Sequence, residues 1–177
     1  MPPEDQSANS VKYMVDPAGL AVSRDVNVSL CTSPLGACLG IAIYDPAARV
    51  GGLLHSLLPA SKLDPKRAAS RPGMFLDTGL AALLAEAEKL NAKRENIRIF
   101  VAGGAQMMDE TGVFNIGKLN TEILGELLPR LGVKVYARQA GGRTSCSMEL
   151  TLATGEVRLR FSGQAAAKTL CKPSKIT

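Results

Sequence analysis

Short apolar runs, many of them rich in β-branched residues, recur along the chain and predict β-strands. Turn-forming residues such as Gly, Pro, Asn and Asp separate several of these runs. The predicted strands cover residues 26–32, 39–44, 50–58, 97–102, 133–138, 147–152 and 156–161. The segment Ala153-Thr154-Gly155 between the last two strands is a hairpin turn signal.

Two longer segments show the apolar period of amphipathic helices. They cover residues 74–90 and 116–131, and leucines dominate the apolar stripe of each. Gly132 follows the second segment directly and suits the C-terminal cap of a helix. Two helices among mostly hairpin-connected strands predict an α+β fold, a mixed β-sandwich or mixed sheet flanked by helices.

The length of 177 residues and a hydrophobic content of 46% fit one soluble domain with a sizeable core. We predict that this domain covers residues 11–162, after a disordered segment at 1–10 and before a basic tail at 163–177. The apolar stretches are shorter than the roughly 18 residues of a membrane helix, and the N-terminus resembles no signal peptide. The sequence therefore predicts a cytoplasmic protein without membrane insertion.

The chain carries a moderate positive net charge of +5. Such an excess generally favours an acidic partner or nucleic acid. Aromatic residues make up only 4% of the chain and Trp is absent, so few side chains are available to stack on bases. We therefore expect no nucleic-acid binding and interpret the C-terminal basic residues as solvated charge.

Four cysteines stand at irregular spacing, namely Cys31, Cys38, Cys146 and Cys171. A domain of this size does not need disulfides, so we expect reduced thiols. A zinc site would have to use Cys31, Cys38 and His55 without any C-x-x-C pair, which matches known ligand spacings poorly. The sequence therefore predicts neither a metal nor another cofactor.

Cys38 and the single histidine, His55, are candidates for cysteine-dependent hydrolysis. A neighbouring imidazole raises the thiolate fraction of a cysteine and later protonates a leaving group. The strands at 39–44 and 50–58 predict a hairpin, and the midpoint between positions 38 and 55 falls within its turn at 46–49. We therefore expect the two residues to be roughly level across the hairpin, so that their side chains can be cross-strand neighbours.

The residues alone leave a second interpretation open. A free cysteine usually behaves as a small buried hydrophobe, and an arbitrary Cys and His in one chain more often belong to the core. The glycines near the pair, at positions 36, 40, 51 and 52, either leave room for a substrate or mark bulges and turns.

The ordered motifs from Thr32 onward resemble those of the CheD family of chemoreceptor glutamine deamidases. The segment Thr32-Ser-Pro-Leu-Gly-Ala-Cys38 is similar to the family pattern T-x-G-L-G-S-C. Tyr44-Asp45 then matches the pattern Y-D. The segment Gly51-Gly-Leu-Leu-His-Ser-Leu-Leu-Pro59 matches the pattern G-G-x-x-H-x-x-L-P. Later similarities follow in family order at Phe75-Leu-Asp77, Gly103-Gly-Ala-Gln-Met107, Ile116-Gly-Lys-Leu-Asn120 and Gly141-Gly142. The resemblance covers about residues 12–161. It rests on the occurrence of all these motifs in family order rather than on any single motif.

The resemblance implies a catalytic Cys, His and Thr, which fall on Cys38, His55 and Thr32. It also implies a mixed β-sandwich with flanking helices, related to deamidating bacterial toxins. The implied reaction converts glutamine side chains of methyl-accepting chemotaxis receptors to glutamate, and methyl-ester hydrolysis at the same sites can accompany it. The implied partners are the receptors' cytoplasmic helices and, in some chemotaxis systems, a CheC-type phosphatase.

Three positions depart from the family pattern. Pro34 replaces its usual Gly, Ala37 replaces the Ser before the nucleophile, and Cys146 stands near the expected place of an Arg. Pro34 removes a backbone N–H and Ala37 a hydroxyl, which affects loop geometry, rate and substrate affinity more than reaction type. Two other functions stay open: a cysteine amidase or esterase with another substrate, and a non-catalytic chemotaxis interaction protein. The intact Cys, His and Thr set favours an enzyme.

Overall fold

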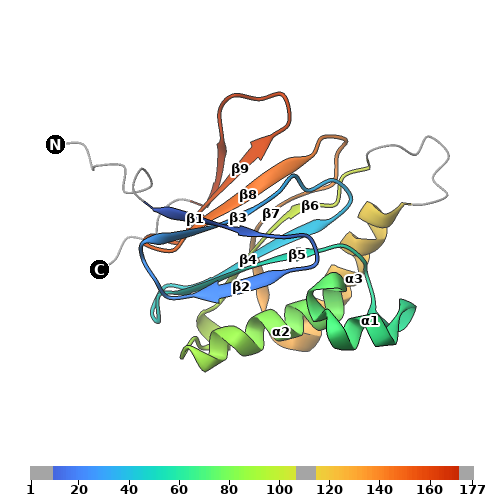
Figure 1. Ribbon diagram of the computed structural model, residues 1–177, viewed down its shortest axis with the longest axis horizontal. Coiled ribbons are helices and arrows are strands. Elements are labelled where there is room, and N and C mark those ends of the chain that lie inside the picture. Colours follow the sequence, from blue (N-terminus) through green and yellow to red (C-terminus); the bar gives the residue numbers. More distant parts are fainter. Residues whose placement is uncertain (1–9, 107–114, 172–177) are drawn as a thin grey trace.

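The computed structural model describes residues 10–106 and 115–171, and these form a sandwich of two five-stranded sheets (Figure 1). We call the sheet with strand order β1-β3-β8-β9-β10 the outer sheet and the sheet with order β2-β5-β4-β6-β7 the central sheet. The strands are β1 (Val11–Val15), β2 (Leu20–Ser23), β3 (Val28–Thr32), β4 (Leu39–Asp45), β5 (Val50–Ser56), β6 (Arg98–Gly103), β7 (Lys134–Ala140), β8 (Cys146–Thr151), β9 (Glu156–Phe161) and β10 (Lys168–Cys171).

The hairpin of β4 and β5 forms the middle of the central sheet. Every residue of both strands is buried, because the outer sheet covers one face of the hairpin and helices cover the other. Burial on both faces explains why these strands read as continuous apolar runs. Alternate residues enter different cores: Ile41 and Ile43 pack with the helices, whereas Ala42 and Tyr44 pack with the outer sheet.

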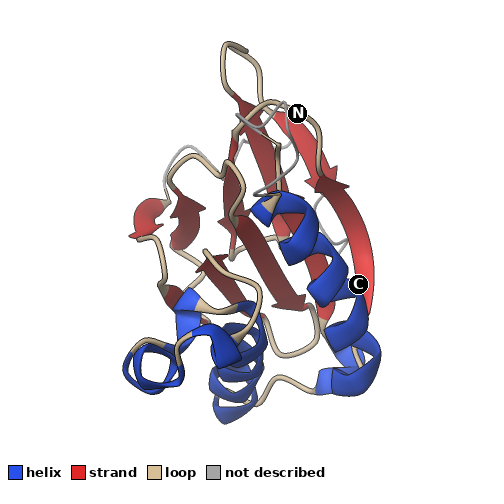
Figure 2. Ribbon diagram, turned by 90° about the vertical axis from the view of Figure 1, so that its right-hand side faces the viewer, coloured by secondary structure: helices blue, strands red, loops and turns tan. Residues whose placement is uncertain are grey.

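Two long helices, α2 (Leu76–Lys89) and α3 (Ile116–Leu131), pack against the face of the central sheet that is turned away from the outer sheet (Figure 2). The side chain of Asn115 caps the start of α3 by accepting the Lys118 N–H, and Gly132 ends the helix in a left-handed conformation, as predicted. The shorter helices are η2 (Ser61–Leu63), α1 (Pro65–Ser70), η3 (Pro72–Met74) and η4 (Arg94–Asn96).

The predicted α+β sandwich with flanking helices is confirmed, and the seven predicted strands correspond to β3 through β9. The connections are less uniform than expected, because β1 pairs with β3 and β6 with β7 in parallel. Prediction missed β1, β2 and β10, which are edge strands whose residues, except for Val15, are exposed or half-buried and so lack a clear apolar pattern.

The structure extends past the predicted end of the domain at residue 162. β10 lies inside the segment 163–177 that was predicted as a tail, and it pairs with β9. Residues 1–9 of the predicted disordered segment and residues 172–177 of the predicted tail lie outside the described residues.

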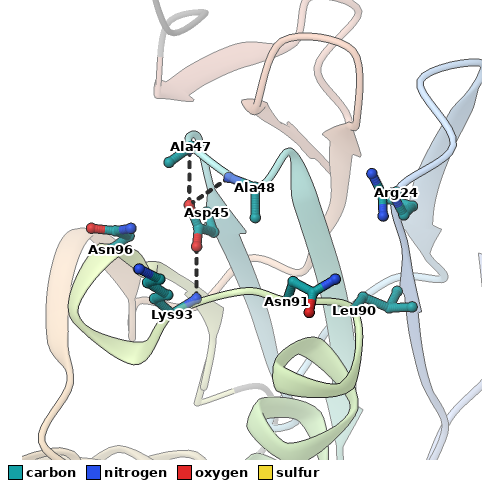
Figure 3. A pocket seen from close by; sticks show the side chains of 8 residues that line it. All are labelled: Arg24, Asp45, Ala47, Ala48, Leu90, Asn91, Lys93 and Asn96. Carbon is teal, nitrogen blue, oxygen red and sulfur yellow. Dashed lines mark hydrogen bonds between the residues drawn. The ribbon is translucent and has the colours of Figure 1, made fainter.

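Asp45 ends β4 and holds the turn of the β4–β5 hairpin. Its carboxylate accepts the backbone N–H groups of Ala47 at 2.8 Å, Ala48 at 3.0 Å and Lys93 at 2.8 Å. Figure 3 shows these bonds at a cavity of about 370 Å³. Because three donors satisfy the buried carboxylate, Asp45 has a structural role at the opposite end of β4 from Cys38.

Candidate active site

Cys38 directly precedes β4, and His55 lies near the end of the neighbouring strand β5. The observed register pairs His55 with Gly40 and Ser56 with Leu39. Cys38 is therefore not directly opposite His55 but lies diagonally across from it, two residues from the level position. The reason is that the hairpin is centred between positions 47 and 48, one position later than level side chains require.

Cys38 and His55 nevertheless face the same layer, between the two sheets. Cys38 packs against the core there, and His55 alternates with Leu53, a member of that core. Diagonal neighbours on one sheet face are about 7–8 Å apart, within reach of longer side chains. Gly40 lies opposite His55, and a Cβ on it would come within 2.6 Å of Leu35 Cδ1, so this glycine leaves room for the Leu35 side chain in the core.

Hydrogen bonds from the segment that follows β6 hold the loop that carries Cys38. The N–H of Gly104 donates to the Cys38 carbonyl at 2.8 Å, and that of Ala105 donates to the Gly36 carbonyl at 2.9 Å. Gly103 and Gly104 have φ angles of +95° and +64°, which side chains of L-residues disfavour. A Cβ on Gly103 would also collide with the Cys38 carbonyl oxygen. The two glycines therefore allow the close approach that positions the nucleophile loop.

His55 is almost fully buried, and the loop between β1 and β2 holds its backbone. Its N–H donates to the Gly19 carbonyl at 3.0 Å, and its carbonyl accepts the Ala18 N–H at 2.9 Å. The backbone of Val15 lies near the imidazole and raises its pKa, against the larger lowering by burial. Among the described residues, Nδ1 of the ring has no hydrogen-bond partner. Sequence reasoning assigned no function to this loop, whose only signal is the turn-forming sequence Asp-Pro-Ala-Gly.

Thr32 ends β3 in the outer sheet and alternates with Leu30, which belongs to the core between the sheets. Its register partner in β1 is Val15, whose backbone contacts the imidazole of His55. The Thr32 hydroxyl oxygen accepts the Met148 N–H at 3.0 Å. A hydroxyl that accepts a hydrogen bond still has its own hydrogen to donate. The fold thus brings all three residues of the predicted set to the layer between the sheets.

Burial favours the neutral forms of both reactive groups. It raises the pKa of the Cys38 thiol, and a hydrogen bond from the backbone of Cys38 itself partly opposes this shift. Burial also lowers the pKa of the His55 imidazole, against smaller opposing effects of the Val15 backbone and the Asp16 charge. At neutral pH the resting pair is therefore a thiol and a neutral imidazole. His55 is then suited to remove the thiol proton during attack on a substrate.

A direct titration of His55 is feasible because the chain has one histidine. We expect the proton NMR signal of its ring to titrate with a midpoint below the ordinary value of about 6.5, because burial disfavours the imidazolium. Any activity that needs His55 as a base should then fall only as the pH drops through this lowered pKa. A midpoint above the ordinary value would contradict the neutral resting pair.

Comparisons with known proteins bear on the identity of this site. The family model described as "CheD chemotactic sensory transduction" matches residues 57–161. A protein of Syntrophus aciditrophicus named "Probable chemoreceptor glutamine deamidase CheD 1" is 38% identical over 142 residues, which cover 80% of this chain and 89% of the relative. This chain belongs to the CheD family. The "Chemoreceptor glutamine deamidase CheD" of Thermotoga maritima is 33% identical over 153 residues, 86% of this chain and 94% of the relative.

The later CheD motifs lie around the site. The segment 103–105 holds the nucleophile loop, and the side chain of Asn120 donates to the carbonyls of Ala37 and Leu57. Sequence reasoning gave Asn120 no role, and its only signal was membership of the I-G-x-x-N motif. Met107, the last residue of the G-G-A-x-M motif, lies outside the described residues.

The three departures from the CheD pattern leave the loop attached to its neighbours. Pro34 is exposed, and the bonds that hold the loop begin at the next residue, where Leu35 and Cys146 exchange two backbone hydrogen bonds of 2.6 and 3.1 Å. Ala37 is half-buried, and its carbonyl accepts a bond from Asn120. Cys146 itself is buried in the core between the sheets, and burial raises the pKa of its thiol.

The four cysteines, all within the described residues, are free thiols. Among residues 10–106 and 115–171, no three side chains of His, Cys, Asp and Glu are grouped so as to hold a metal ion. A cavity of about 270 Å³ on the outer sheet is lined partly by Cys31 and Thr32, but neither it nor the cavity at Asp45 is lined by Cys38 or His55. No helix in the described part of the chain has the length and apolar character needed to cross a membrane.

Proposed function

We propose that this chain converts specific glutamine side chains of a methyl-accepting chemotaxis receptor to glutamate, with Cys38 as the nucleophile. The observation that carries the proposal is that Cys38, directly before β4, and His55, on the adjacent strand β5, face the same layer between the two sheets. The curated relatives named as chemoreceptor glutamine deamidases add the substrate class. The proposed substrate is the helical cytoplasmic region of the receptor, so the proposed site of action is the cytoplasm.

The first half of the reaction forms a thioester. His55 takes the proton of the Cys38 thiol as the sulfur attacks the carboxamide carbon of the glutamine. The C–S bond forms, and the carbonyl oxygen of the amide becomes an oxyanion. The backbone N–H of Cys38, which lies beside its own thiol and lowers the pKa of that thiol, is proposed as a donor to this oxyanion. The C–N bond then breaks, and the protonated imidazole gives its proton to the departing ammonia.

The second half of the reaction releases glutamate. Neutral His55 takes a proton from water as the water oxygen attacks the thioester carbon. The C–S bond breaks, and the imidazolium returns its proton to the sulfur of Cys38. The balance is amide plus water giving carboxylic acid plus ammonia. A methyl ester at the same carbon would react through the same thioester and release methanol.

Thr32 is proposed to orient the imidazole. A hydroxyl can fix the ring by a hydrogen bond, although it stabilises imidazolium less than a carboxylate does. The unpartnered Nδ1 of His55 and the position of Thr32 beside Val15 support this role. A CheC-type phosphatase is a second proposed partner, supported by the family membership alone.

The test is incubation of the purified chain with the cytoplasmic domain of a receptor from the same genome, followed by peptide mass spectrometry. We expect specific glutamines to become glutamates faster than in receptor incubated alone. Failure to convert any glutamine of the organism's receptors would contradict the proposal. Hydrolysis of a different amide or ester in the same assay would favour an enzyme with another substrate, and receptor binding without conversion would favour an interaction protein.

A further inference from the structure

Asn120 connects the two segments that carry Cys38 and His55. It lies in the second turn of α3 and is 1% exposed. Its side-chain nitrogen donates to the Ala37 carbonyl at 3.0 Å and to the Leu57 carbonyl at 3.2 Å. Ala37 directly precedes the nucleophile, and Leu57 follows the histidine by two residues. One amide group therefore joins both reactive segments.

These bonds lie where the sheet no longer provides them. The ladder between β4 and β5 ends at the pair of Leu39 and Ser56. Beyond this pair the two strand segments separate. Cys38 belongs to the loop before β4, and Leu57 donates its N–H to the Met74 carbonyl instead of to β4. Asn120 replaces the missing ladder bonds at the position where the relative placement of thiol and imidazole is set.

The close approach of α3 to the nucleophile loop puts Asn120 within reach. A Cβ on Gly117 would lie 2.6 Å from the carbonyl oxygen of Gly104 and 2.8 Å from that of Ala105, so this turn of the helix touches the segment that holds the loop. The carbonyl oxygen of the Asn120 side chain is buried without a partner among the described residues. An unpaired buried acceptor costs free energy, whereas an apolar residue of similar shape carries no such cost.

We infer that Asn120 is a positioning residue, which holds the Cys38 loop against the His55 strand so that the imidazole reaches the thiol. The inference rests on the proposed roles of Cys38 and His55. Displacement of a reacting group by about 1 Å can lower a rate by about 100-fold, so loss of the two bonds is sufficient to reduce activity strongly.

The test compares Asn120→Asp with Asn115→Asp, the same change at the cap of the same helix. A carboxylate at position 115 still accepts the Lys118 N–H, whereas one at position 120 cannot donate to two carbonyls. The readout is the pH profile of iodoacetamide alkylation of Cys38, followed on its peptide by mass spectrometry. This readout needs no receptor, so it is independent of whether the chain deamidates one.

We expect Asn120→Asp to slow alkylation of Cys38 by about 10-fold at neutral pH and to give the pH profile of His55→Ala, because general-base assistance is lost. Asn115→Asp should match the unmodified protein. On receptor substrate, kcat should fall by about 100-fold with KM within about twofold. Asn120→Leu, which removes both donors without adding charge, serves if the acidic variant does not fold.

Leu124→Ala separates positioning from stability, because Leu124 is buried on the same helix but its apolar side chain has no donor for either carbonyl. It should lower the melting temperature and leave the alkylation profile unchanged. The inference is overturned if the Asn120 variants keep the normal profile, if Leu124→Ala changes it equally, or if His55→Ala itself has no effect. An absence of receptor deamidation with a normal His55-dependent profile would instead refute the proposed function alone.

Discussion

Cys38→Ala should lower glutamine conversion by at least about 1000-fold, the largest effect that we expect of any single substitution. Cys38 supplies the sulfur that forms the proposed thioester, and it faces the same layer as His55 across the β4–β5 hairpin. The measurement is the rate of glutamate appearance in receptor peptides by mass spectrometry. An alanine is also small and apolar, so the half-buried position tolerates it.

Cys31→Ala is the matched control for this prediction. Cys31 is also a free thiol, and it lies on a strand of the outer sheet where burial raises its pKa to about 11. We expect this variant to retain normal conversion, because its thiol takes no part in the proposed reaction. Conversion that persists in Cys38→Ala would refute the mechanism, and loss in both variants would point to a general effect of cysteine removal.

Gly103→Ala should destabilise the protein by about 3 kcal/mol or more and also abolish Cys38 reactivity. The added Cβ would meet the carbonyl oxygen of Cys38, and a backbone atom cannot move aside as the end of a side chain can. The φ angle of +95° adds strain for any residue with a Cβ. Urea unfolding measures the stability, and iodoacetamide alkylation of Cys38 under native conditions measures the displacement of the loop.

Gly125→Ala is the matched control for Gly103→Ala, because the same added methyl group should here raise the stability of the protein. Gly125 is a solvent-exposed residue in the middle of α3, and a Cβ there would meet no atom within 4 Å. Alanine is the better helix former, so we expect a gain of about 0.5–1 kcal/mol and unchanged Cys38 reactivity. Equal stability of Gly103→Ala and the unmodified protein would show that the close contact with Cys38 does not exist in solution.

The strands and long helices were predictable because local apolar patterns reflect burial. The register of the β4–β5 hairpin was not. Both strands are buried on both faces, so no polar alternation identifies which residues oppose each other, and the inferred pairing of Cys38 with His55 was two residues away from the observed one. The edge strand β10 escaped notice because its residues are exposed or half-buried.

The motifs around Cys38 and His55 identified the family, and the family comparison confirmed it. The apolar periodicity was sufficient for an α+β sandwich, because each element must bury one face or stripe. The contacts that assemble the site were decided only in three dimensions. Val15 reaches the reactive segments from another strand, Gly104 from the segment after β6, and Asn120 from a helix far away in the chain. Such contacts depend on how the layers pack, and packing joins residues that no local pattern relates.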